Sequence, residues 1–297
     1  MTSRDRRSPV RCFLVAFATA CSVLLAGCEP KPPQQEFLSR HTLLADYNAR
    51  AEAITRLWSR CHIDVDMPKS SGDPAATKAA GRETYSADGH FIFAKPRNLI
   101  LQGKVPFVGA VFGLHSNQDE YWFWVKPGQS CEWKGHHGGA GQDRLFLRPD
   151  RLLETLGMFA VPADGRAVFR RDAETDVIQV LAESPLPPEA NSGFSSLYVV
   201  QEIHLDRLKH DPVSVRLLSP SGEPLVVSQL SGYREVDGQR IPGTMIFRFL
   251  HLGQVRNETV VTLKFKDITL TKDLSEAAFA YRTPPVDRHV DVDSDEP

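Results

Sequence analysis

The chain has 297 residues, with 35 basic and 37 acidic side chains, and its formal charge is −2. Hydrophobic residues make up 41% of it and aromatic residues 9%, which excludes a wholly disordered chain. The balance of charge argues against a nucleic-acid partner, because neutralising a phosphate backbone requires a surplus of Lys and Arg.

The first 28 residues closely resemble a bacterial lipoprotein signal. Four arginines precede an uncharged stretch over residues 12–27, and residues 25–28 read LAGC. A basic start, a short apolar stretch and small residues before the cut are typical of a secretory signal rather than a spanning helix. We therefore expect cleavage after residue 27 and lipidation of Cys28 with acyl chains such as palmitate. The alternative is a plain signal-anchor that ends in cysteine.

Cleavage would leave a mildly acidic chain, with 31 basic against 36 acidic residues. Its attachment to the membrane would then depend on acyl chains rather than on a polybasic surface. Glu29 stands where a retention signal commonly carries Asp, which favours the periplasmic face of the outer membrane over the inner membrane. Residues 28–35 comprise the lipidated cysteine and a Pro-rich tether.

Hydrophobic periodicity divides the rest of the chain. Apolar residues at steps of three and four predict a helix over residues 36–59, and alternation over residues 61–67 predicts a strand. Residues 68–81 are expected to form a polar loop, and Asp88-Gly89 is typical of a hairpin turn. More strands are expected up to residue 134, then a short helix over residues 151–156, then strands from residue 167 to residue 270.

A dozen hairpin-linked strands with two helices predict an α+β fold that is mostly antiparallel β. Such a sheet is expected to curl, because curling limits exposed edges. The domain is expected to span residues 36–283. The acidic tail over residues 284–297 contains hardly any core-forming residues and is expected to be disordered.

Besides the leading helix, the distinctive segments of this domain are Phe93–Leu99, Asp119–Pro127, Pro149–Gly157, Tyr233–Gly238 with Ile241-Pro242, and Ile268–Phe279. Together they resemble the LolA/LolB superfamily of periplasmic lipoprotein carriers and outer-membrane lipoprotein receptors. The resemblance implies an unclosed half-barrel, with the two helices as a lid over a hydrophobic cavity that holds acyl chains of lipids or lipoproteins. The lipoprotein signal favours an anchored receptor, with a periplasmic carrier protein as a candidate partner.

The stretch Tyr121–Val125 is apolar on both faces of its strand, as expected where one face lines a cavity and the other packs under a helix. Which face lines the cavity stays open. An acyl cavity requires little more than bulky apolar side chains. The alternative for each residue is ordinary core. The candidate lining residues are Tyr85, Phe91, Phe93, Leu99, Leu101, Phe112, Leu114, Tyr121, Trp122, Phe123 and Trp124.

The segment Phe107–Phe112 is also apolar, and it follows Pro106. We slightly favour the prediction that this segment is the buried start of a strand. The alternative is an exposed loop that inserts into a membrane or receives an acyl chain, as the protruding loop of the resembled receptor does.

Two cysteines, Cys61 and Cys131, remain in the mature chain and are expected to meet an oxidising compartment. A disulfide between them would close a loop of about 70 residues. The alternative is two buried free thiols, since cysteine is often buried and its pairing depends on geometry.

The sequence predicts no catalytic residue, metal or cofactor. His136-His137 lacks a third ligand at suitable spacing. Residues 291–295 lack the glycine of a calcium loop, and residues 193–196 lack the second glycine of a nucleophile elbow. The leading hypothesis is a non-enzymatic lipoprotein that binds acyl chains and takes part in lipoprotein sorting to the outer membrane. The alternatives are an envelope-stress or assembly module with the same fold and, third, a periplasmic hydrolase.

Overall fold

The structure is a computed structural model that describes residues 38–68, 81–126, 130–139, 148–162, 166–172, 174–183, 197–251 and 254–294. The chain divides into two compact units, residues 1–38 and 39–297, and every element described below belongs to the second. Cys28, the tether and most of the 68–81 loop lie outside the described residues, so the predictions for them stay predictions.

The first described element is helix α2 (Arg40–Ala53). The Ser39 hydroxyl accepts a hydrogen bond from the Thr42 amide at 3.1 Å and so caps its first turn. The sequence predicted that this helix would continue to residue 59. Instead strand β1 begins at Arg56, where burial already alternates residue by residue. Pairing of β1 with strands on both sides outweighs the helical spacing at this point.

Fourteen strands form one sheet, in the order β16-β6-β5-β4-β3-β2-β1-β15-β14-β11-β10-β9-β8-β7. All neighbours are antiparallel except β16 and β6. The strands are β1 (Arg56–Pro68), β2 (Arg82–Ala94), β3 (Asn98–Val105), β4 (Gly109–Ser116), β5 (Glu120–Val125), β6 (Cys131–His136), β7 (Ala167–Arg171), β8 (Thr175–Glu183), β9 (Leu197–Asp206), β10 (Pro212–Leu218), β11 (Pro224–Ser231), β14 (Thr244–His251), β15 (Gln254–Thr269) and β16 (Arg288–Asp291). A separate hairpin pairs β12 (Arg234–Val236) with β13 (Gln239–Ile241).

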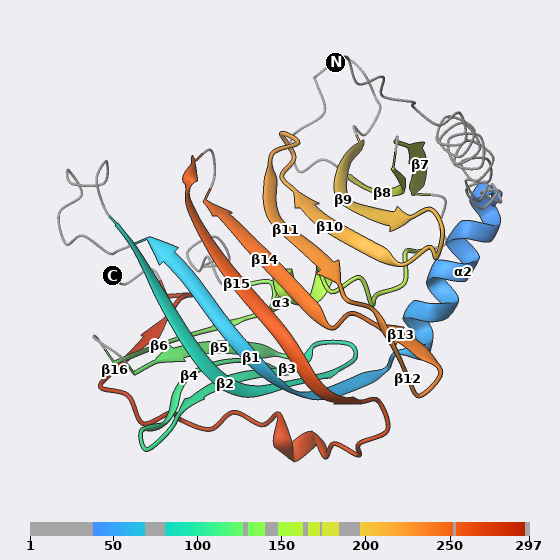
Figure 1. Cartoon of the computed structure of the whole chain (residues 1–297). Coiled ribbons are helices and arrows are strands. Elements are labelled where there is room, and N and C mark those ends of the chain that lie inside the picture. The colour runs from blue at the N-terminus through green and yellow to red at the C-terminus, as the bar shows by residue number, and fades with distance from the viewer. Residues whose placement is uncertain are drawn as a thin grey trace, which may run out of the picture. The chain divides into compact units, whose positions relative to one another are not determined.

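The sheet is curled but not closed, because its edge strands β16 and β7 do not pair with each other (Figure 1). The fold is therefore a half-barrel, and the predicted fold class is confirmed. Neighbouring strands align their inward-facing side chains. Phe91 on β2 pairs with Leu101 on β3, Leu101 with Leu114 on β4, and Leu114 with Phe123 on β5. Phe91 and Leu114 are fully buried, so the concave face holds the core.

Strand β2 is continuous where the sequence predicted a hairpin turn at Asp88-Gly89. Gly89 pairs with Cys61 on one side and with Gly103 on the other. A Cβ at residue 89 would lie 2.0 Å from the carbonyl oxygen of Gln102. The glycine therefore permits close approach of two strands, which is the second common use of glycine in a sheet.

The C-terminal segment also differs from the prediction. Residues 284–294 are not disordered, because Arg288–Asp291 form β16, parallel to β6. Val292 is 4% exposed and packs against Tyr121. The sheet thus extends beyond the expected boundary at residue 283. The local composition could not reveal this strand, because its stability comes from pairing with a segment more than a hundred residues earlier.

Candidate functional site

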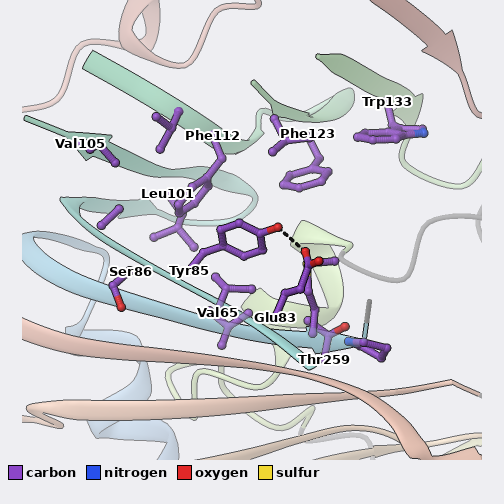
Figure 2. A pocket seen from close by; sticks show the side chains of 16 residues that line it. Val65, Glu83, Tyr85, Ser86, Leu101, Val105, Phe112, Phe123, Trp133 and Thr259 are labelled. Atoms are coloured by element: carbon purple, nitrogen blue, oxygen red, sulfur yellow. Dashed lines mark hydrogen bonds between the residues drawn. The ribbon is translucent and has the colours of Figure 1, made fainter. Parts of the chain in front are cut away.

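A cavity of about 360 Å³ opens on the concave face of the half-barrel (Figure 2). Strands β1 to β6 and β15 contribute its walls, and period-two alternation turns every second side chain toward it. Most of the lining is apolar. The lining residues are Val65, Met67, Pro68, Glu83, Tyr85, Ser86, Ala87, Leu101, Val105, Val111, Phe112, Phe123, Val125, Trp133, Thr259 and Val261.

The cavity combines a buried interior with an accessible rim. Leu101 and Val261 are each 2% exposed, whereas Tyr85 is 44% exposed. Phe123 and Trp133 stack with ring centroids 5.6 Å apart and form an aromatic wall. A chamber with buried apolar walls and an accessible rim suits a ligand with an apolar body and a polar head.

A glycine positions another aromatic side chain in this wall. Gly103 on β3 pairs with Phe112 on β4. A Cβ at residue 103 would lie 2.2 Å from the Phe112 ring, so the ring covers the glycine directly. The absence of a side chain at residue 103 thus leaves room for the Phe112 ring against the sheet.

The predicted lining residues fall into three groups. Tyr85, Leu101, Phe112 and Phe123 line the cavity. Five others lie on the same face but are packed into the core away from the cavity, and each is fully buried: Phe91, Phe93, Leu99, Leu114 and Tyr121. Trp122 and Trp124 alternate with Phe123 and lie on the opposite face, so their inclusion among lining residues is wrong for this cavity.

The segment that follows helix α3 (Pro149–Glu154) packs on the core group at Phe93, whose ring centroid lies 5.7 Å from that of Phe159. The hydroxyl of Ser228 on β11 donates to the Thr155 carbonyl at 2.7 Å. Asn48 on α2 bonds both the amide and the carbonyl of Val161, at 2.8 and 2.9 Å. This segment fills part of the concave face, and the cavity lies in the part that remains.

On the convex side of the sheet, the C-terminal segment packs on Trp122 of β5. Trp122 and Trp124 are 3% and 5% exposed. The Tyr281 ring meets Trp122 edge-on, with centroids 5.2 Å apart, and the Lys134 ammonium lies 3.9 Å from the Tyr281 centroid. The second apolar face of β5 therefore packs under an extended segment, not under the helix that the sequence analysis expected.

Sequence reasoning missed several lining residues. Val65 and Met67 could have been found, because they continue the alternation that begins at Cys61. Trp133 stands on a predicted strand and was overlooked. Glu83 stands two residues before the predicted lining residue Tyr85, so alternation places both on one face. It was overlooked because a charged residue near a strand end is normally expected to face solvent.

The turn between β3 and β4 carries two exposed apolar side chains. Phe107 is fully exposed and Val108 is 65% exposed. Phe107 has a φ of +64°, which is uncommon for a bulky residue. The favoured prediction of a buried strand start is therefore wrong for these two residues.

The candidate disulfide does not form, since Cys61 and Cys131 are both free and buried. Cys61 lies on β1 and Cys131 on β6, with four strands between them in the sheet. Five interstrand steps therefore separate the two cysteines along the sheet, and they do not lie on neighbouring strands. Burial, with a contribution from Asp88, raises the pKa of Cys61 to about 12.

One serine and histidine pair bears on the hydrolase alternative. The Ser116 hydroxyl lies 3.0 Å from Nε2 of His137. The same nitrogen lies 3.1 Å from the Asn117 carbonyl oxygen, which can only accept. Nε2 therefore carries the proton and cannot take one from Ser116, which is itself fully buried. Residues 193–196 lie outside the described residues.

In the His136-His137 pair that the sequence analysis considered as metal ligands, Nδ1 of His136 lies 3.1 Å from the Asp293 carboxylate. Within the described residues, no three His, Cys, Asp or Glu side chains are grouped so that they could hold a metal ion. In the same part of the chain, no helix is long and apolar enough to cross a membrane.

No family model matches the sequence, and the search of curated proteins gives no match. Similar solved structures include a LolA superfamily protein from Nitrosomonas europaea, with 10% identity, a TM-score of 0.48, and coverage of 82% of this chain and 99% of that one. Another is a putative outer membrane lipoprotein-sorting protein domain from Vibrio parahaemolyticus, with 15% identity and a TM-score of 0.45. That match covers 80% of this chain and 94% of the other. A DUF1329 family protein from Desulfovibrio piger is similar with 11% identity and a TM-score of 0.44, and the match covers 80% of this chain and 95% of that one.

The superfamily that the sequence resembles is thus among the structural matches.

Proposed function

We propose that this protein is a lipid-anchored envelope lipoprotein that binds an acyl chain of a lipid or lipoprotein in the concave cavity. The single observation that carries the proposal is the cavity itself, whose 360 Å³ are lined mainly by aliphatic and aromatic side chains. This volume lies within the ~300–1,000 Å³ typical of small-molecule sites. Each methylene moved from water into such a chamber contributes about 0.8 kcal/mol, so even a partly buried chain gains useful affinity.

The exposed turn at Phe107 supports a role at a membrane or with acylated cargo. Adjacent exposed apolar side chains at a hairpin tip are available to pack against an apolar partner such as a membrane or an acyl chain. Together with the lipoprotein signal, the turn favours an anchored receptor at the periplasmic face of the outer membrane that takes part in lipoprotein sorting. Binding, rather than catalysis, is the proposed activity.

The experiment that tests acyl binding uses the mature chain from Glu29, which keeps every described residue. Lipids extracted from the purified chain are identified by mass spectrometry, and the chain is titrated with a fluorescent fatty acid and a fluorescent monoacylglycerol. We expect a bound acyl species or saturable uptake at micromolar concentration. The proposal fails if extraction yields no acyl species and neither probe binds.

The anchoring part of the proposal is tested separately. Replacing Cys28 with Ala is expected to leave an unprocessed precursor and no mature lipoprotein, because the acylated residue would be absent. A Cys28→Ala variant that matures normally and still fractionates with membranes would contradict lipidation at this residue.

A further inference from the structure

Glu83 places a carboxylate among the apolar residues that line the cavity. Among the described residues that line the cavity it is the only carboxylate, and no Lys, Arg or His is found with it there. Glu83 pairs with Met67 on β1 and so shares the inward face of β2 with Tyr85 and Ala87. Figure 2 shows the Tyr85 ring in the cavity, with its hydroxyl hydrogen-bonded to the Glu83 carboxylate.

No described residue forms an ion pair with Glu83. Its chain neighbour Arg82 belongs to the opposite face and is already bonded there. The Arg82 guanidinium lies 2.9 Å from the Asp66 carboxylate and donates to the Glu258 carbonyl at 3.1 Å. The charge of Glu83 therefore lies beside the apolar chamber without a cation from the described residues to offset it.

This charge has consequences for the head group of a bound acyl chain. A carboxylate or phosphate head at the rim would face a like charge at short range, and the two charges would repel each other. A head that carries N–H or O–H donors would instead find acceptor oxygens on Glu83.

We propose, building on the acyl-binding function above, that Glu83 makes the cavity select acyl chains whose head is not anionic and donates an N–H or O–H group. Fatty amides and monoacylglycerols have this chemistry, whereas fatty-acid and phospholipid anions do not. Glu83 is then a specificity-determining residue, and Tyr85 orients its carboxylate. Because the Glu83 hydrogen bond raises the pKa of Tyr85, the Tyr85 hydroxyl keeps its proton and adds no second charge.

The test compares heads on one chain length. Dodecanamide, monododecanoylglycerol and dodecanoate each displace a fluorescent monoacylglycerol from the chain beginning at Glu29, at about pH 8, where dodecanoate is ionised. We expect dodecanoate to bind about tenfold more weakly than the two uncharged ligands. Glu83→Gln should reduce the difference to about twofold, mainly by strengthening dodecanoate binding, and Glu83→Lys should reverse the preference.

Glu258→Gln is the matched control. Glu258 lies near the same end of the sheet on β15 but is paired with Arg248 at 3.0 Å, so its removal should leave the preference unchanged. Equal affinity for all three ligands, or a tenfold preference that survives Glu83→Gln in a folded variant, would overturn the selectivity while leaving acyl binding intact. If none of the three ligands binds, the proposed function fails, and the selectivity fails with it.

Discussion

Tyr281 and Trp122 pack edge-to-face, with ring planes at 89° and centroids 5.2 Å apart, and so join the C-terminal segment to the convex face of the sheet. The Tyr281 hydroxyl also donates to the Glu132 carboxylate at 3.1 Å. Glu132 is 1% exposed, and its other carboxylate oxygen has no hydrogen-bond partner. This contact therefore combines aromatic packing with the partial satisfaction of a buried charge.

Tyr281→Ala is expected to destabilise the fold by about 2–4 kcal/mol, from the lost packing on Trp122 and the lost hydrogen bond to Glu132. The measurement is urea unfolding followed by tryptophan fluorescence. Tyr281→Phe is the matched variant, since it keeps the ring, and it should lose only about 1 kcal/mol. A loss below about 0.5 kcal/mol for Tyr281→Ala would show that the segment contributes little to stability.

His115 predicts a dependence of stability on pH. Burial lowers the pKa of His115 to about 4, and its ring stacks on Trp122 with centroids 5.3 Å apart. In the unfolded chain this histidine has a pKa near 6.5, so as the pH falls the unfolded state takes up the proton first. The contribution of His115 to the free energy of unfolding is therefore fully present above about pH 6.5 and decreases as the pH drops toward 4. The loss attributable to this group is about 3 kcal/mol at most.

His115→Phe should flatten the curve of unfolding free energy against pH between about 6.5 and 4. His41→Phe, at an exposed position of α2, is the control and should leave the curve as in the parent chain. The same slope in the parent and in His115→Phe would assign the acid sensitivity to other groups.

The two mature cysteines should both be reactive once the chain is unfolded. Thiol titration of the chain from Glu29 under denaturing, non-reducing conditions is expected to find two thiols, since both are free in the structure. In the native state, Cys61 should react slowly, because it is 1% exposed and burial holds its pKa near 12. A denatured chain without reactive thiols would establish the disulfide.

The Phe107 turn should be dispensable for folding but not for association with apolar surfaces. Phe107→Ser removes a fully exposed ring, so the free energy of unfolding should change by less than about 0.5 kcal/mol. Binding of the unlipidated chain to phospholipid vesicles, measured by co-sedimentation, should weaken several-fold. Leu208→Ser, at another exposed apolar position, is the control. Equal weakening by both variants would show that the turn has no special role.

Local sequence patterns predicted most of the strands, because period-two alternation of apolar residues indicates which side chains face a core. They could not choose between Phe123 and Trp122 as lining residues, since both faces of β5 are covered by apolar neighbours. They misassigned Asp88-Gly89, because a turn and a close approach of two strands use the same residue. Strand β16 depends on pairing with a segment distant in sequence and has no local signature. Alternation does place Glu83 on the face of Tyr85, but its charge alone favours the opposite interpretation.

The most direct test of the account fills the cavity. Val65→Phe adds an aromatic ring to a lining position, and Val168→Phe makes the same change at a position on β7 that is 43% exposed. Affinity for a fluorescent monoacylglycerol is measured for both variants after their unfolding curves have shown that they are folded. The account predicts that Val65→Phe lowers affinity about tenfold or more while Val168→Phe leaves it unchanged. Unchanged affinity in a folded Val65→Phe variant would contradict acyl binding in this cavity.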